Sequence, residues 1–210
     1  MFGRFARALA TPENNKRLLN VGGRSKAIPI PAQYAGWEHH LLDIDPRGKP
    51  DLLCDARELA TLAPGQYDAI YCSHNLEHYL QHDARRVLAG FLSLLRDDGF
   101  VDIRVPDIGQ LMQRCVRDGL DLDDDLYDSP AGPIKVRDVL WGFGEEVESS
   151  GNDFYAHKTG FTPTSLTRIL EGAGFAEVFL DAEGAPWLEI DAIAFKRAGP
   201  NPHKALFGIP

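Results

Sequence analysis

Leu18-Leu19-Asn20-Val21-Gly22-Gly23 is the stretch of sequence that decides the fold, and Leu41-Leu42-Asp43-Ile44-Asp45 follows it about twenty residues later. The first stretch is an apolar run that ends in two glycines, which carry no Cβ and therefore let a ligand approach the backbone closely. The second ends in carboxylates, and an acid at the end of such a strand can accept hydrogen bonds from both hydroxyls of a ribose. The pair predicts the first two strands of an α/β domain with a nucleoside-binding edge.

Further apolar runs read as strands and alternate with helical patterns. Apolar residues at i, i+1, i+4, i+7 and i+8 from Val87 to Leu95 predict a helix that Gly99 ends. Strands that alternate with helices predict a parallel sheet with right-handed crossovers. The expected strands are residues 17–21, 40–44, 51–55, 67–73, 100–105, 176–181 and 189–196, and the other expected helices are residues 57–62, 107–119 and 163–173.

Prolines and glycines limit two further segments. Pro29 and Pro31 make a long helix in residues 24–38 unfavourable, because proline lacks the backbone N–H that a helix interior uses. Gly184 and Pro186 separate the last two strands, which we therefore expect to pair as an antiparallel hairpin.

Charge and cysteine content limit the class of partner and the compartment. The sequence has 22 basic and 31 acidic residues, a net charge of −9, whereas nucleic acids and anionic membrane surfaces favour basic patches. Cys54, Cys72 and Cys115 show neither a disulfide framework nor zinc-site spacing, which indicates a reducing cytoplasm. No apolar run approaches the roughly 18 residues that span a bilayer. We expect no nucleic-acid partner and no membrane insertion, and the oligomeric state stays open.

Small and polar residues that directly follow the strands form the candidate site. Ligands of parallel α/β sheets bind beyond the carboxyl ends of the strands. The residues at these positions are Gly22, Gly23, Asp43, Asp45, Asp55, Ser73, His74 and Asp107.

The order and spacing of the motifs resemble the class I S-adenosylmethionine-dependent methyltransferases, and most of all the small type 11 methyltransferases. The first two motifs are Leu-Asn-Val-Gly-Gly and Leu-Asp-Ile-Asp-Pro. After them come Cys-Asp-Ala-Arg-Glu-Leu, Tyr-Asp-Ala-Ile-Tyr-Cys-Ser-His-Asn-Leu-Glu-His-Tyr and the late Leu-Glu-Gly-Ala-Gly-Phe. The likeness covers residues 17–108 and 157–196. It implies a Rossmann-like, doubly wound, mostly parallel seven-stranded sheet with a C-terminal antiparallel hairpin.

The resemblance implies S-adenosylmethionine as the cofactor. Gly22 and Gly23 would line its methionine part. Asp43 would bind the ribose hydroxyls, with Asp45 as the substitute. The full set of cofactor-binding residues that the resemblance implies is Val21, Gly22, Gly23, Asp43, Ile44, Asp55, Ala56, Ser73 and His74.

The adenine and the reacting methyl are expected near three later positions. Asp55 would accept a hydrogen bond from the adenine amino group, and the N–H of Ala56 would meet a ring nitrogen. Ser73 and His74 would lie beside the transferable methyl. Methyl transfer is an in-line displacement that depends mostly on proximity and alignment. A base can help by taking a proton from a hydroxyl or amine acceptor, and His74 and His157 are the candidate catalytic residues.

The acceptor is expected to be a small molecule or a glycan or lipid precursor. Residues 120–160 are acidic and are expected to be irregular, and a long loop in a compact domain is usually functional or disordered. Trp141, Phe143 and Trp187 are candidates for an apolar acceptor pocket. The expected parts are a leader (1–16), a methyltransferase domain (17–198) with a lid or acceptor-side insertion (107–160), and a tail (199–210).

Two departures from the family pattern leave a second reading open. Asn20 stands where the family usually has an acid, and Arg24 stands near the place of a further glycine. The helix that usually follows the first motif is also replaced by the proline-containing segment. The alternative is therefore a catalytically degenerate protein of the same fold that binds a nucleoside ligand or a protein partner. A dinucleotide-dependent oxidoreductase is a third reading, which the missing third glycine disfavours.

His74-Asn75-Leu76-Glu77-His78 matches the H-x-x-E-H signature of one class of zinc peptidase. That signature needs both histidines on one regular helix. Here His74 is expected at the turn between a strand and a helix, so the sequence predicts no metal.

Overall fold

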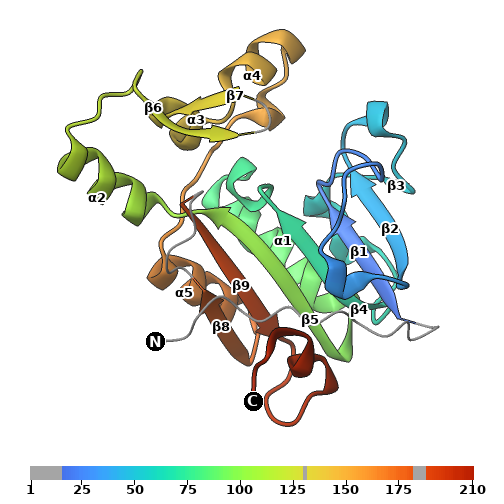
Figure 1. Cartoon of the computed structure of the whole chain (residues 1–210). Helices are drawn as coiled ribbons and strands as arrows, with labels where there is room; N and C mark the ends of the chain where they lie inside the picture. The colour runs from blue at the N-terminus through green and yellow to red at the C-terminus, as the bar shows by residue number, and fades with distance from the viewer. Residues whose placement is uncertain (1–15, 130–131, 182–187) are drawn as a thin grey trace.

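A seven-stranded sheet forms the centre of the computed structural model, which describes residues 16–129, 132–181 and 188–210 (Figure 1). The strand order is β3-β2-β1-β4-β5-β9-β8. The first five strands of that order run parallel, and β9 is antiparallel to both of its neighbours. The strands are β1 (Arg17–Val21), β2 (Glu38–Asp43), β3 (Leu52–Leu53), β4 (Tyr67–Ser73), β5 (Leu95–Pro106), β8 (Glu177–Asp181) and β9 (Glu189–Phe195). The predicted sheet and its C-terminal antiparallel pair are confirmed.

The pairing of β1 brings the motif residues to one edge of the sheet. Val21 is in register with Leu42 of β2 and with Cys72 of β4, because β1 lies between these two strands. The residues that follow, Gly22 and Asp43, therefore lie side by side beyond the carboxyl ends of the strands. This edge is also where the strand order reverses, the usual place of a ligand in such a sheet.

Two long helices cover one face of the sheet (Figure 1). They are α1 (Gln81–Leu94) and α5 (Pro163–Ala173), which contact each other. Thr162 caps α5 through its side chain, and Gly174 ends it in a left-handed conformation, as the sequence predicts. α1 ends at Leu94 instead of Gly99, because Leu95 already pairs with Tyr67 and begins β5.

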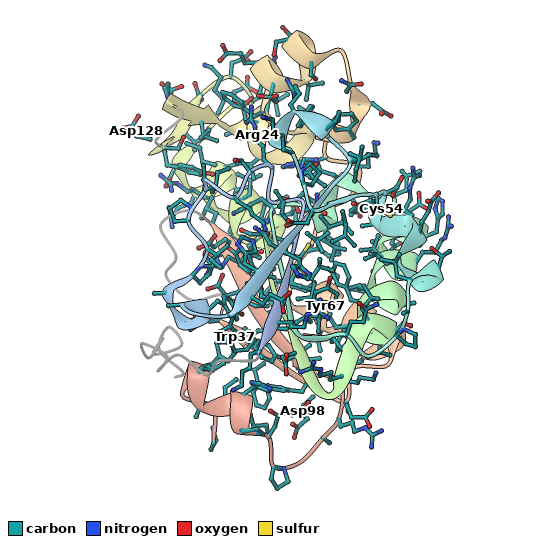
Figure 2. All side chains as sticks on the ribbon, turned by 90° about the vertical axis from the view of Figure 1, so that its right-hand side faces the viewer. Arg24, Trp37, Cys54, Tyr67, Asp98 and Asp128 are labelled. Carbon is teal, nitrogen blue, oxygen red and sulfur yellow. The ribbon has the colours of Figure 1, made fainter. Side chains whose placement is uncertain are left out.

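The other face is covered by short elements. η1 (Ala32–Tyr34) and η6 (Pro202–Phe207) pack their aromatic rings on it, and Figure 2 shows Trp37 close to η6. Phe207 is 1% exposed and contacts Phe100 at the centre of this face. Residues 199–210 thus contribute to the hydrophobic core. In residues 24–38, only η1 is helical, as the prolines predict.

Residues 120–160 contain regular structure, so the expectation of an irregular segment is wrong. They form the hairpin of β6 (Asp125–Ser129) and β7 (Gly132–Lys135), followed by α3 (Val136–Trp141), α4 (Gly144–Ser150) and η5 (Asp153–Tyr155). α2 (Ile108–Asp118) leads into them. A separate small core of Leu111, Leu126, Val136, Val139 and Leu188 holds these pieces together. The members of this core are far apart in the sequence, from Leu111 to Leu188, and acidic residues lie between them. A search for local apolar periodicity therefore does not detect it.

Some predictions fall outside the part of the chain that the structure describes. These are the leader, apart from Lys16, and the residues Gly184, Pro186 and Trp187. Among the described helices, none has the length and apolar character needed to cross a membrane.

The packing of η6 gives a test of the C-terminal core. We expect Phe207→Ala to lower the free energy of unfolding by about 3–5 kcal/mol, because it removes a buried ring and leaves a cavity. Val116→Ala is the control, since Val116 is 86% exposed on α2 and its truncation should change stability by about 0.5 kcal/mol or less. Urea unfolding measures both, and equal small effects would mean that residues 199–210 are dispensable for the core.

Candidate functional site

A cavity of about 600 Å³ opens at the carboxyl ends of the parallel strands. Its wall combines residues from strand ends and short helical turns with η5 and Lys158. Three predicted site residues line it, namely Asp43, Ile44 and Asp55. Ten further residues complete the wall: Arg57, Asn75, His78, Tyr79, Leu80, Asp83, Asp153, Phe154, Tyr155 and Lys158.

The turn after β1 is closely packed, and this packing explains both glycines. Gly22 has a φ of 71° and donates its N–H to the carbonyl of Leu42, at 2.9 Å. A Cβ on Gly22 would lie 2.1 Å from Nδ2 of Asn75. A Cβ on Gly23 would lie 2.2 Å from Nδ2 of Asn20. A larger residue at either position would therefore displace one of two amide side chains, and at Gly22 it would also strain the left-handed backbone.

The carboxylate of Asp43 joins the loop after β1 to the loop after β2. Its Oδ2 accepts the N–H of Arg24 at 2.8 Å, and its Oδ1 accepts the N–H of Asp45 at 2.9 Å. An ionised carboxylate has about four lone-pair positions. Two therefore stay open, and Asp43 faces the cavity although its residue surface is only 8% exposed.

Asp45 anchors the 120–160 segment instead of lining the cavity. Its Oδ2 accepts hydrogen bonds from Nε of Arg47 at 2.7 Å and from the hydroxyl of Tyr155 at 2.6 Å. Burial disfavours the charged carboxylate, but the bonds from Tyr155 and Arg47 outweigh it and lower the pKa of Asp45. Glu146 of α4 adds ion pairs to Arg24 at 3.2 Å and to Arg47 at 3.3 Å. Figure 2 shows Arg24 beside this segment.

Asp55 begins η3 (Ala56–Thr61) and is held by an arginine. Its Oδ1 accepts the N–H of Arg57 at 2.9 Å, and its Oδ2 pairs with Nη2 of the same residue at 2.6 Å. These bonds lower the pKa of Asp55. Ala56 is buried below it. Nη1 of Arg57 lies 3.4 Å from Oδ2 of Asp83. Arg57 thus adds a positive charge to the cavity wall, which the sequence alone does not predict.

Ser73 ends β4, and His74 follows it in a strained conformation with a φ of 49°. The His74 ring lies between two carboxylates, with Nδ1 at 3.6 Å from Oε1 of Glu77 and Nε2 at 3.4 Å from Oε2 of Glu189. Burial lowers the pKa of His74, but the flanking carboxylates of Glu189 and Glu77 outweigh burial and raise the pKa to about 10. Half of the side chain is exposed.

The two predicted catalytic histidines lie on either side of Glu77, although 83 positions separate them in the sequence. Nε2 of His157 is 3.9 Å from Oε1 of Glu77, and its Nδ1 lies 2.9 Å from the carbonyl oxygen of Val139. Burial lowers the pKa of His157. Glu77 itself is 1% exposed. No signal in the sequence, apart from the H-x-x-E-H match, pointed to Glu77 or His78.

The remaining predicted residues take other positions. Val21 is buried at the end of β1. Seven of the predicted site residues do not line the cavity: Val21, Gly22, Gly23, Ala56, Ser73, His74 and His157. Asp107 caps α2 by accepting the N–H of Gln110 at 3.1 Å. Trp141 is 55% exposed, and Phe143 is half-buried.

Comparison with known proteins places these features in a family. Residues 1–178 match the sequence profile of a family described as a methyltransferase domain. A search of curated protein sequences finds no match.

Solved structures share the fold at low sequence identity. A methyltransferase from Archaeoglobus fulgidus described as SAM-dependent is 16% identical, with a TM-score of 0.55 over 86% of each chain. A protein from Pyrococcus horikoshii is 10% identical, with a TM-score of 0.57 over 86% of this chain and 82% of that one. An O-methyltransferase family protein from Burkholderia thailandensis is 13% identical, with a TM-score of 0.53 over 88% of this chain and 52% of the other.

The hydrogen bond between Tyr155 and Asp45 predicts that removing the Tyr155 hydroxyl loosens the 120–160 segment locally. We expect Tyr155→Phe to speed backbone amide exchange in residues 144–158 by roughly 5-fold, which corresponds to a loss of about 1 kcal/mol for a partly exposed hydrogen bond. Tyr67→Phe is the control, because its hydroxyl contacts His40, which lies outside this segment. Hydrogen exchange with mass spectrometry measures both, and an unchanged rate in Tyr155→Phe would refute the anchor.

Proposed function

The chain belongs to the methyltransferase domain family, and we propose that it transfers a methyl group from S-adenosylmethionine to a small-molecule, glycan or lipid-precursor acceptor. The observation that carries the proposal is the cavity beside the glycine turn, whose wall includes Asp43, Ile44 and Asp55. Its volume of about 600 Å³ is within the usual range of small-ligand sites.

The donor and acceptor groups of the cavity fit the parts of this cofactor. The two open lone-pair positions of Asp43 suit the two hydroxyls of the ribose. Asp55 and the N–H of Ala56 would meet the adenine, and Arg57 would add a cation to that wall. The Gly22–Gly23 turn would hold the methionine part, whose carboxylate can use backbone N–H groups. Ser73 and His74 would then flank the reacting end.

When bound, the cofactor supplies a methyl group on a positively charged sulfur. The methyl carbon forms its new bond to the acceptor atom while the bond to sulfur breaks, and the electron pair stays on sulfur. The chain's own residues would hold the two reactants in line, which is the largest contribution that such a displacement needs. A hydroxyl or amine acceptor also loses a proton, for which His74 and His157 are the candidates. His74, with a pKa of about 10, is already protonated at neutral pH, whereas the lowered pKa of His157 leaves it able to accept the proton.

The contacts of residues 120–160 favour a different role from the acceptor lid that the sequence predicts, whose deletion would impair acceptor use more than cofactor binding. Glu146 and Tyr155 connect residues 120–160 to the loops after β1 and β2, and η5 lines the cavity. The segment would therefore close over the cofactor as well as the acceptor. Deleting it should impair the binding of both, whereas a pure acceptor lid would spare the cofactor.

We also propose a cytoplasmic protein that acts on a ligand other than nucleic acid. The three cysteines are free in the structure, which suits a reducing compartment. The net charge of −9 disfavours an anionic polymer as acceptor.

The role of Asp43 can be tested by removing its charge. We expect Asp43→Asn to weaken the binding of S-adenosylhomocysteine by about 1–3 kcal/mol, roughly 5- to 150-fold in Kd, because ribose hydroxyls lose a charged acceptor. Asp68→Asn is the matched control: Asp68 is also buried and accepts a backbone N–H, from Arg17, but at the amino ends of the strands. Calorimetric titration measures each Kd.

Two outcomes of that titration contradict the assignment. An equal loss in Asp68→Asn would mean that Asp43 acts only through stability. Absence of binding to the wild-type protein, by S-adenosylmethionine and S-adenosylhomocysteine alike, would favour the degenerate, non-catalytic alternative.

The glycine turn gives a second test. Gly22→Ala should cost about 1–2 kcal/mol of stability from its left-handed backbone and should also abolish cofactor binding, because the new Cβ displaces Asn75, which lines the cavity. Gly65→Ala shares the backbone penalty, with a φ of 67°, but a Cβ there meets no atom within 4 Å. The control should unfold more easily yet bind as tightly as the wild type. Retained binding in Gly22→Ala would exclude the turn from the site.

A further inference from the structure

Glu77 is a buried carboxylate at the turn after β4. It is 1% exposed, and within the part of the chain that the structure describes neither of its oxygens has a hydrogen-bond partner. The nearest side-chain nitrogens recorded are Nδ1 of His74 at 3.6 Å and Nε2 of His157 at 3.9 Å from Oε1. Buried charges in proteins are paired closely or coordinate metals, because desolvation is otherwise costly. His74 supplies a positive charge on one side of Glu77, but from beyond hydrogen-bond distance, so the carboxylate keeps lone pairs that a further positive group could use.

Two histidines next to Glu77 present the same ring nitrogen to a ligand. Nδ1 of His157 lies 2.9 Å from the carbonyl oxygen of Val139, and Nδ1 of His78 lies 3.2 Å from that of Ala156. A carbonyl oxygen only accepts, so each Nδ1 carries a hydrogen, and in the neutral ring Nε2 then has the lone pair that a metal ion needs. Metal-binding histidines are usually oriented in this way, with the other ring nitrogen donating to a backbone carbonyl.

Backbone contacts hold the three side chains in place. The carbonyl oxygen of Glu77 accepts the N–H of Lys158 at 2.8 Å and the N–H of Thr159 at 3.1 Å. The N–H of His157 donates to the carbonyl of Trp141 at 3.0 Å. The rings of His78 and His157 lie edge to face with their centres 4.9 Å apart. The turn η4 (Leu76–His78) and the end of the 120–160 segment thus form one preassembled cluster.

We propose that Glu77, His78 and His157 bind one divalent transition-metal ion of the zinc type. Their candidate ligand atoms all lie within 4.8 Å of one another. Zinc bonds to nitrogen and oxygen are about 2.0–2.2 Å, so two ligand atoms of a tetrahedral site lie about 3.4 Å apart. Binding would therefore need the 3.9 Å pair to close by about 0.5 Å and a pair near the 4.8 Å bound by about 1.4 Å. Two imidazoles and one carboxylate are a donor set that zinc uses.

The site differs from the one that the H-x-x-E-H spacing suggested. His74 is not a member, because it is placed between Glu77 and Glu189. His157 joins instead, from a segment that the sequence pattern did not connect with it. As a metal ligand its Nε2 would not be free to accept a proton, so metal binding and the proposed base role of His157 exclude each other. Three protein ligands leave a coordination position open. His78 is part of the cavity wall, so the ion would lie at the edge of the cavity.

Metal binding can be measured without any methyl acceptor. Untagged protein is stripped with a chelator, dialysed and titrated with Zn²⁺ by calorimetry, and with Co²⁺ followed by absorption. We expect one equivalent of each ion to bind. Glu77→Gln and His157→Asn should each weaken binding by more than the roughly 10- to 100-fold that loss of an outer-shell partner causes. His82→Asn, which changes an exposed histidine outside the cluster, should bind like the wild type.

Folding controls keep the test decisive. Circular dichroism establishes that each variant is folded, and His78→Gln, at a half-buried position, replaces any variant that is not. The proposal is overturned if the wild-type protein binds less than one equivalent of both ions at micromolar concentration. It is also overturned if the folded Glu77 and His157 variants bind as tightly as His82→Asn. Because the readout is metal affinity, the result is independent of the proposed methyl transfer.

Discussion

The carboxylate of Asp43 is the constraint on which the cavity depends. It accepts the N–H groups of Arg24 and Asp45, and so fixes the loops after β1 and β2 against each other. Residues 24–38 contain only one short helical turn, η1, so no long helix stabilises the first loop. Arg24 also has a left-handed φ of 58°, which needs support from its surroundings. The ion pairs of Glu146 with Arg24 and Arg47 supply a second layer of that support.

The fold could be predicted in detail where the signals are local. Strand periodicity gave β1 and β4 with their observed bounds, and the Thr162 cap and Gly174 stop gave α5. The elements of residues 120–160 escaped prediction, because their small core joins positions as distant as Leu111 and Leu188. Patterns within a short stretch of sequence do not indicate contacts between residues this far apart.

The same division holds for the candidate site. Asp43, Ile44 and Asp55 could be placed at the cavity because each follows a recognisable strand. Arg57 and Tyr155 could not, since their roles arise from contacts with Asp83 and Asp45 that only the folded chain creates. Glu77 likewise gathers histidines from distant segments, and His78 belongs both to this cluster and to the cavity wall. The cavity and the Glu77 cluster are therefore adjacent parts of one surface.

A crystal structure with S-adenosylhomocysteine tests the central claim, that the cavity at Asp43 is the cofactor site, most directly. The account predicts electron density in the cavity, with both ribose hydroxyls within hydrogen-bond distance of the Asp43 carboxylate and the adenine beside Asp55 and Ala56. Asp43 should keep its bonds to the backbone of Arg24 and Asp45. Density for the ligand elsewhere on the chain, or an empty cavity at saturating ligand concentration, would contradict the account.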